Sequence, residues 1–440
     1  MSIIGSKEMS EATFWYKKQS APDMMLVTPE EIETINKKVA ASNCGITDLK
    51  TLEASYDAEA LQTMLYKEAK EVTVPFYLEQ EEALYSENGS KLDVYSFDAA
   101  INNILNPDTK SIQDVRYAIV TKLTSFRGLP TDMMILDEEG DYNFDYLYSS
   151  SIKVNDPLVI YNASADGRFC YAKGIYVSGW VPVTDIALCA DKNEWLEAWD
   201  ITDNESLIIY GDKVVTAKTR VMPEISERVL TMGTVLKMVN ESEWPDNIAE
   251  RAPYFNYVVW LPVRREDGSY SRSMALIPYS AKAGRGSLSL TYKNIAEVAM
   301  NMLGNTYGWG GMLDSTDCSG YVWDIYRCFG LKIGKNTRYQ ASMPVYNIDV
   351  KAMEADEKKG LLMKLPLGTL LIMNGHVVLY LGEEDGSFYV INNVSSANRP
   401  DGKGRRIRSV IINSLDITNR NGEKWIELID HMVVPFRSCN

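Results

Sequence analysis

Apolar residues recur at helical spacing in the first quarter of the chain. The stretch Thr28-Pro29-Glu30-Glu31 has the pattern of a helix start, because Thr28 can cap the first turn and Glu31 can complete a capping box. An apolar stripe follows it, formed by Ile32, Ile35 and Val39. A second helical run follows Asp57, with Leu61, Met64 and Leu65 on one side. Residues 1–110 are therefore predicted to be a helical segment that packs against other domains and carries no chemistry.

Short β-type runs separated by turns begin near Val115. The first set includes Leu158 to Tyr161, a turn at Asp166-Gly167, and Gly179-Trp180-Val181. Strands spaced by about 8–12 residues with glycine turns are typical of a small barrel. A second set runs from Leu207 to Ile277. The sequence therefore predicts two small all-β barrels in tandem, over residues 111–200 and 201–284, too dissimilar to count as a repeat.

The last third of the chain changes pattern again. Ala281 to Ser287 is small, basic and rich in glycine, which indicates a linker. A helical run from Asn294 to Leu303 follows, and later strands are expected at 368–373, 377–381, 388–391, 407–412 and 432–434. Asp385-Gly386 has the pattern of a hairpin turn. Helices followed by antiparallel strands predict an α+β domain over residues 285–440.

Composition narrows the possible partners and cofactors. The formal net charge of −15 argues against nucleic acid and anionic membrane surfaces. No apolar run approaches the roughly 20 residues of a membrane-spanning helix. The six cysteines form no C-x-x-C pair, so free, partly buried thiols are expected and neither a structural metal nor a cofactor is predicted. A monomer is favoured, although the sequence leaves the oligomeric state open.

The stretch from Thr306 to Phe329 carries the candidate chemistry. A glycine-rich loop runs into Asp317-Cys318-Ser319-Gly320, and an amphipathic helical run follows at once. A cysteine at a helix N-terminus is expected to favour the thiolate, because the free N–H groups and the helix dipole attract negative charge. Cys318 is therefore predicted to be a nucleophile. The alternative is ordinary packing, with Cys318 and the loop aromatics Tyr307 and Trp309 in a core.

A cysteine nucleophile needs a base and a group that orients the base. Only two histidines exist in the chain. His376 follows a glycine and begins an apolar strand, whereas His431 has the context of a surface or strand-edge residue, so His376 is the predicted base. The orienting group is sought at the end of a neighbouring strand, where Asn392 is the first choice and Asn393 the second.

These residues resemble the motifs of the NlpC family, a compact papain-like group of bacterial cell-wall cysteine peptidases. The likeness covers residues 287–440 and rests on Tyr307 to Gly311, Asp317 to Gly320, Asn336-Thr337 with Gln340, and Gly375-His376 heading a strand. The upstream part resembles an arrangement in which a helical segment and two bacterial SH3-like barrels precede the peptidase. Gly179-Trp180-Val181 matches a recurrent strand of such barrels.

The resemblance implies hydrolysis of the γ-D-glutamyl–diamino-acid bond of peptidoglycan stem peptides. It implies Cys318 as nucleophile and His376 as base, and a barrel that narrows the cleft so that a free N-terminal L-Ala is preferred. The residues expected at the substrate are Asp317, Ser319, Tyr307, Trp309, Asn336 and Thr337. Two positions depart from the family pattern: Asn392 stands where relatives often have histidine, and Asn336 where they often have an acid.

Two other functions fit the same sequence. The barrels could grip wall peptide or glycan while the peptidase domain is idle or weakly active, or the thioester could be transferred to an amine instead of water. The start of the chain lacks a signal-peptide pattern, which favours cytoplasmic recycling of wall peptides; a mature form of a longer chain would place the enzyme in the periplasm or outside the cell. The sequence does not distinguish diaminopimelate from lysine stems.

Overall fold

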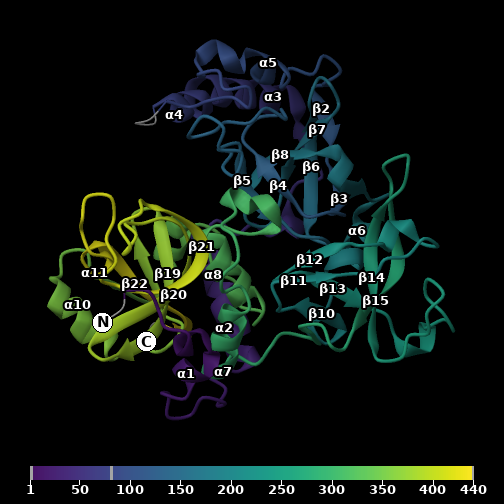
Figure 1. The fold of residues 1–440 in the computed structure, drawn as a ribbon. Helices are drawn as coiled ribbons and strands as arrows, with labels where there is room; N and C mark the ends of the chain where they lie inside the picture. Colours follow the sequence, from purple (N-terminus) through teal and green to yellow (C-terminus); the bar gives the residue numbers. More distant parts are fainter. Residues whose placement is uncertain (1–2, 80–82, 439–440) are drawn as a thin grey trace.

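The computed structural model describes residues 3–79 and 83–438, and its parts match the predicted order. Figure 1 shows the C-terminal domain beside two β-rich domains, with helix α8 on the side that faces them. Within the described residues, no helix is both long and apolar enough to span a bilayer. The cysteines described are all free thiols, as predicted, while Cys439 lies outside the described residues.

The N-terminal helices divide between two domains. Helices α1 (Ala12–Tyr16) and α2 (Pro29–Ala41) join the core of the C-terminal domain, to which they contribute Trp15, Ile35 and Val39. The predicted capping box at Thr28 and Glu31 is present at the start of α2. Figure 1 shows α1 beside helix α7 of the C-terminal domain. This half of the segment is therefore structurally part of that domain.

The other N-terminal helices pack on the first barrel. They are α3 (Ala58–Glu68), α4 (Val74–Leu78) and α5 (Asp98–Asn102), and Asp57 caps α3. Their apolar residues share a core with Phe169 and Trp180 of the barrel. Met64, expected on the buried side, is exposed. A two-stranded ribbon of β1 (Ser55–Asp57) and β2 (Ile112–Asp114) closes this region.

The first barrel, barrel 1, is built on one antiparallel sheet of seven strands in the order β5-β4-β8-β7-β6-β3-β9. The strands are β3 (Arg116–Val120), β4 (Thr124–Arg127), β5 (Tyr148–Ile152), β6 (Pro157–Ala163), β7 (Phe169–Lys173), β8 (Ser178–Pro182) and β9 (Ile186–Leu188). The predicted strands at 158–161 and 179–181 lie inside β6 and β8. Helix α6 (Lys192–Trp199) leads to the second barrel.

The second barrel, barrel 2, combines a five-stranded sheet with a two-stranded one. The larger sheet contains β10 (Ser206–Ile209), β13 (Val235–Met238), β14 (Asn256–Arg264), β15 (Tyr270–Pro278) and β16 (Ala283–Arg285), and the smaller contains β11 (Lys213–Val215) and β12 (Val229–Thr231). Strand β16 lies in the predicted linker, so that prediction is wrong there. Ala283 to Arg285 pair with β10, an interaction that their composition does not reveal.

The C-terminal domain is a six-stranded sheet covered on both faces. The strand order is β17-β22-β18-β19-β20-β21, and the strands are β17 (Val345–Asp349), β18 (Leu370–Met373), β19 (His376–Glu384), β20 (Ser387–Ser396), β21 (Arg406–Ser414) and β22 (Ile429–Ser438). Alternate residues such as Leu379 and Tyr380 belong to different cores, as the period of two in a strand requires. Helices α7 (Tyr292–Met300) and α8 (Cys318–Arg327) supply one core, while α10 (Ala355–Leu362) and α11 (Trp425–Leu428) supply the other.

Candidate active site

Cys318 is the first residue of α8. Asp317 caps the helix, since its Oδ1 accepts from the Gly320 N–H at 2.7 Å and from the Ser319 hydroxyl at 3.0 Å. All residues of the helix from Cys318 to Tyr326 are buried, because the sheet covers one face and the barrels cover the other. The Cys318 Sγ lies 4.0 Å from the carbonyl oxygen of Gly375, the residue before His376. The fold thus brings the two predicted catalytic segments together.

His376 and Asn392 are hydrogen-bonded across neighbouring strands. His376 begins β19, Asn392 lies in β20, and the imidazole Nε2 is 3.2 Å from the Asn392 Oδ1. An N–H at Nε2 leaves the Nδ1 lone pair available as a base. Trp425 packs edge-on against the imidazole with 5.0 Å between ring centroids, which shields this hydrogen bond from water.

A third amide, Asn413 of β21, sets the orientation of Asn392. The Asn392 Nδ2 donates to the Asn413 Oδ1 at 2.8 Å, and the Asn413 Nδ2 donates to the Ser414 carbonyl at 3.0 Å. Both amides are fully buried. Each donor in this series points away from the imidazole, so the Asn392 oxygen faces the ring. Sequence reasoning missed Asn413, and no local pattern marks it.

The second-choice amide and the second histidine have other partners. Asn393 donates from Nδ2 to the carbonyl of Thr316 at 2.6 Å and so braces the chain just before the nucleophile. His431 lies on β22, between β17 and β18, and contacts Asn347. It therefore lies inside the sheet, whereas its sequence context had suggested a surface or strand-edge position. These placements favour Asn392 and His376 for the site.

Burial keeps both reactive groups in their neutral forms. Desolvation raises the pKa of Cys318 to about 12, and Asp317 adds to this increase, whereas backbone N–H groups of Val377 and Ser319 oppose it. Burial also lowers the pKa of His376 to about 4, although the hydrogen bond to the Asn392 Oδ1 opposes this decrease. Burial of the thiol therefore acts against the expected resting thiolate, because the loss of hydration opposes the effect of the helix N-terminus.

The glycine-rich loop is pressed against barrel 1. It contains the 3-10 segment η9 (Trp309–Asp314), in which Gly310 and Gly311 have φ of 54° and 96°. A Cβ at Gly310 would lie 2.6 Å from the Tyr148 carbonyl oxygen, and one at Gly311 would lie 2.3 Å from the Ser151 Cβ. Only glycine fits at these positions, so the loop sequence reflects its contact with strand β5.

The loop aromatics and the remaining predicted substrate residues occupy different places. Tyr307 is buried, and its pKa is raised by burial and by the neighbouring Cys318 and Asp317. Trp309 packs against Phe144 and Tyr146 of barrel 1, with centroid distances of 4.7 and 5.8 Å. Both aromatic rings therefore lie where barrel 1 meets the loop before Cys318.

Asn336 and Thr337 form the start of a helix that contacts the site. Asn336 is exposed and caps helix α9 (Thr337–Ala341) by accepting from the Tyr339 N–H at 3.0 Å. In the same helix, the buried Gln340 donates to the carbonyl of Ser319 at 3.1 Å. The structure thus connects this motif to the start of α8 through Gln340, while Asn336 itself has a structural role as a cap.

Barrel 1 contributes an acidic loop that sequence reasoning missed. Asp141 accepts from both Arg408 Nη atoms, one at 2.6 Å, and from Arg406 Nη2 at 3.1 Å, so the loop is tied to β21. On the same loop, Asp137 has a buried Oδ1 for which the described residues offer no hydrogen-bond partner. Burial and the neighbouring Asp141 raise the pKa of Asp137. Among the described residues, no cluster of three metal-binding side chains exists.

A buried thiol at a helix N-terminus, beside a histidine and an asparagine on an antiparallel sheet, is the arrangement that a cysteine hydrolase with a Cys–His–Asn set requires. Residues 304–429 match the model of the NlpC/P60 family, and residues 136–182 match that of an SH3 domain of the SH3b1 type. The chain therefore carries an NlpC/P60 domain, of a family of bacterial cell-wall cysteine peptidases, together with an SH3-like domain, as the resemblance predicted.

Solved structures extend the likeness to the full architecture. A novel NlpC/P60 endopeptidase from Photobacterium damselae subsp. piscicida is 18% identical, with a TM-score of 0.76 over 100% of this chain and 99% of that chain. An NlpC/P60 family protein from Bacillus cereus is 17% identical over 65% of this chain and 82% of its own, with a TM-score of 0.42. No curated protein sequence matches the chain. The first likeness shows that the fold of all the parts is shared.

Proposed function

We propose that this protein is a cysteine endopeptidase that hydrolyses the γ-D-glutamyl–diamino-acid bond of peptidoglycan stem peptides. The observation that carries the proposal is the hydrogen bond of 3.2 Å between His376 and Asn392, beside a thiol that contacts Gly375. Together they supply a nucleophile, a base and a group that can orient the base.

The reaction is an acyl transfer in two steps. His376 takes the Cys318 proton at Nδ1 as the sulfur attacks the γ-carbonyl carbon, and backbone N–H groups at the start of α8 stabilise the oxyanion. The imidazolium then protonates the departing amine of the diamino acid, which leaves a thioester. Water deprotonated by His376 hydrolyses the thioester and restores the thiol. Because thiol and imidazole are neutral at rest, the proton transfer accompanies the attack.

The barrel 1 side of the site supports a preference for a free N-terminal amine on L-Ala. A buried ammonium needs a carboxylate partner. Asp317 uses Oδ1 to cap α8. Within the part of the chain that the structure describes, neither a buried oxygen of Asp137 nor the buried indole N–H of Trp309 has a hydrogen-bond partner. An unpaired acceptor and an unpaired donor on the barrel 1 side favour a polar substrate there. We therefore assign recognition of the amine to Asp137 and Asp317. Ser319, Tyr307 and Trp309 are expected to contact the same part of the substrate.

The test is cleavage of L-Ala-γ-D-Glu-diaminopimelate and of its lysine analogue, followed by mass spectrometry. The parent protein is expected to release the free diamino acid and Cys318→Ala is not. N-acetylation of the L-Ala is expected to raise KM, as is Asp137→Asn, while Glu139→Gln on the same exposed loop leaves KM unchanged. Absence of cleavage by the folded protein would favour the wall-binding alternative, and equal cleavage of the acetylated peptide would remove the amine preference.

A further inference from the structure

A cavity of about 310 Å³ lies where both barrels meet the C-terminal domain. None of Cys318, His376 and Asn392 lines it. Its walls are mainly apolar and come from barrel 1, barrel 2, helix α8 and the segment after α8; they include Phe126, Ile152, Tyr176, Ile208, Val235 and Leu331. A volume of this size is within the range of pockets that bind small molecules.

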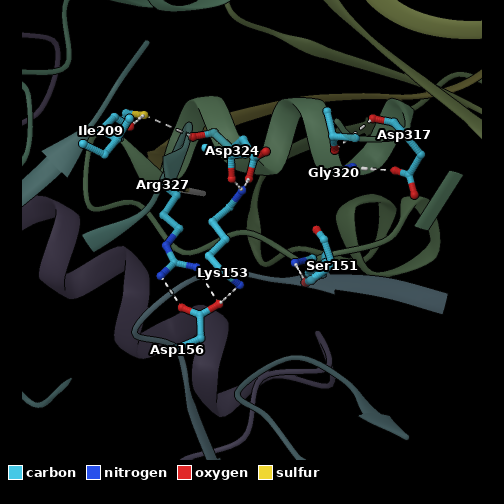
Figure 2. A network of polar contacts seen from close by, with 12 residues as sticks. Ser151, Lys153, Asp156, Ile209, Asp317, Gly320, Asp324 and Arg327 are labelled. Atoms are coloured by element: carbon cyan, nitrogen blue, oxygen red, sulfur yellow. Dashed lines mark hydrogen bonds and ion pairs between the residues drawn. The ribbon is translucent and has the colours of Figure 1, made fainter. Parts of the chain in front are cut away.

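Positive charge is concentrated around Trp323, which lines one wall of the cavity. The indole of Trp323 has three cations near its ring: Lys335 Nζ at 3.8 Å, Arg327 Cζ at 4.9 Å and Lys153 Nζ at 5.8 Å from the centroid. Two of them have carboxylate partners. Lys153 pairs with Asp324 at 2.9 Å, and Arg327 pairs with Asp156 at 2.6 Å (Figure 2). The third cation, Lys335, forms no ion pair with either of these carboxylates.

Lys335 is nine-tenths buried at this wall. Its side chain lines the cavity, its exposed fraction is 9%, and its Nζ donates to the Ser151 carbonyl at 2.6 Å. Among the residues that the structure describes, Lys335 forms no ion pair. Desolvation, followed by the neighbouring Lys153, lowers the pKa of Lys335 to about 8. A buried ammonium is normally paired, and the bond to Ser151 uses only one of the three donors of this ammonium.

The charged residues at the mouth of the cavity do not supply a carboxylate partner for Lys335. Lys332 and Asp203 are both exposed there and offset each other, and Asp203 accepts from the Ser287 N–H at 2.9 Å and from its hydroxyl at 2.7 Å. The charged residues that line the cavity are three cations and two carboxylates. The surplus is therefore a single positive charge at the buried end.

We propose that this cavity is a binding site for a small organic monocarboxylate with an apolar body, whose carboxylate pairs with Lys335. The apolar walls accommodate the body, and the single surplus charge selects a monoanion over a cation or a neutral molecule. Because the cavity walls come from three domains, the bound carboxylate stabilises the junction between the barrels and α8. This site is independent of the peptidase chemistry.

The experiment is calorimetric titration of the full chain with four probes: sodium octanoate, 1-octanol, octylammonium chloride and sodium acetate. Octanoate is expected to bind about tenfold more tightly than octanol, because a hydrogen bond to a buried charge is among the strong ones. Octylammonium and acetate, which lack the right charge or the apolar body, are expected to bind more weakly still. Carboxamidomethylation of Cys318 is expected to leave octanoate binding unchanged.

Lys335→Met is expected to bring octanoate and octanol within about twofold of each other, whereas the matched variant Lys332→Met at the mouth retains the tenfold preference. Lys335→Gln replaces the first variant if that one does not fold. The proposal is overturned if octanoate binds no more tightly than octanol, if no probe binds, if the preference survives in both Lys335 variants, or if alkylation of Cys318 abolishes binding.

Discussion

The two members of the buried ion pair between barrel 1 and α8 are expected to respond unequally to neutralisation. Lys153 and Asp324 are 2.9 Å apart, with exposed side-chain fractions of 2% and 6%. Asp324→Asn removes one of two carboxylates from a cluster of three cations, so Lys153 and Lys335 lose their nearest negative charge. Removing one partner of a buried ion pair costs about 3–5 kcal/mol in unfolding free energy.

Lys153→Met is expected to cost much less. Asp324 also interacts electrostatically with Lys335 and Arg327, so its carboxylate keeps two cations nearby after the substitution. The cluster then holds two cations and two carboxylates. Since no uncompensated charge remains, the expected loss is only about 1–2 kcal/mol, mainly for the lost hydrogen bond.

The assay is urea unfolding followed by tryptophan fluorescence, because Trp323 lies within 5.8 Å of the Lys153 ammonium. Thermal unfolding provides a second measure, in which Asp324→Asn is expected to lower the Tm by about 6–20 °C. The double variant completes a cycle and is expected to be less damaging than the sum of the single variants. If Lys153→Met destabilised the protein as much as Asp324→Asn, the surplus of positive charge would be refuted.

Three further predictions concern the catalytic domain. Asn413→Leu removes the acceptor for the Asn392 amide and is expected to lower kcat about tenfold, while Asn413→Asp keeps an acceptor and stays within about threefold; equal rates for the two variants would contradict this role. Alkylation of Cys318 by iodoacetamide, mapped by mass spectrometry, is expected to rise about tenfold per pH unit from pH 7 to 10, because its pKa is raised to about 12; a plateau below pH 7 would indicate a thiolate. Asp141→Ala releases Arg408 and so loosens the contact between barrel 1 and β21, and KM is expected to rise severalfold with little change in kcat; an unchanged KM would show that this part of barrel 1 does not contact substrate.

The sequence alone determined the local features of the fold. The capping box at Thr28, the helix at Cys318, the hairpin at Asp385-Gly386 and most strands were predictable, because caps, turns and periodicity depend on neighbouring residues. The nucleophile and base were also proposed from short motifs. The division of the helical segment between two domains was not predictable, because both halves have the same amphipathic pattern and only their packing partners differ.

Tertiary structure decided what depends on contacts between distant residues. The choice of Asn392 over Asn393 follows from which side of β20 faces His376, and the role of Asn413 follows from strand pairing. The tie between Asp141 and Arg408 joins residues that are 267 positions apart. The neutral state of the Cys318 thiol has the same origin: the helix N-terminus is encoded locally, but the desolvation that outweighs it arises only when the sheet and the barrels close around α8.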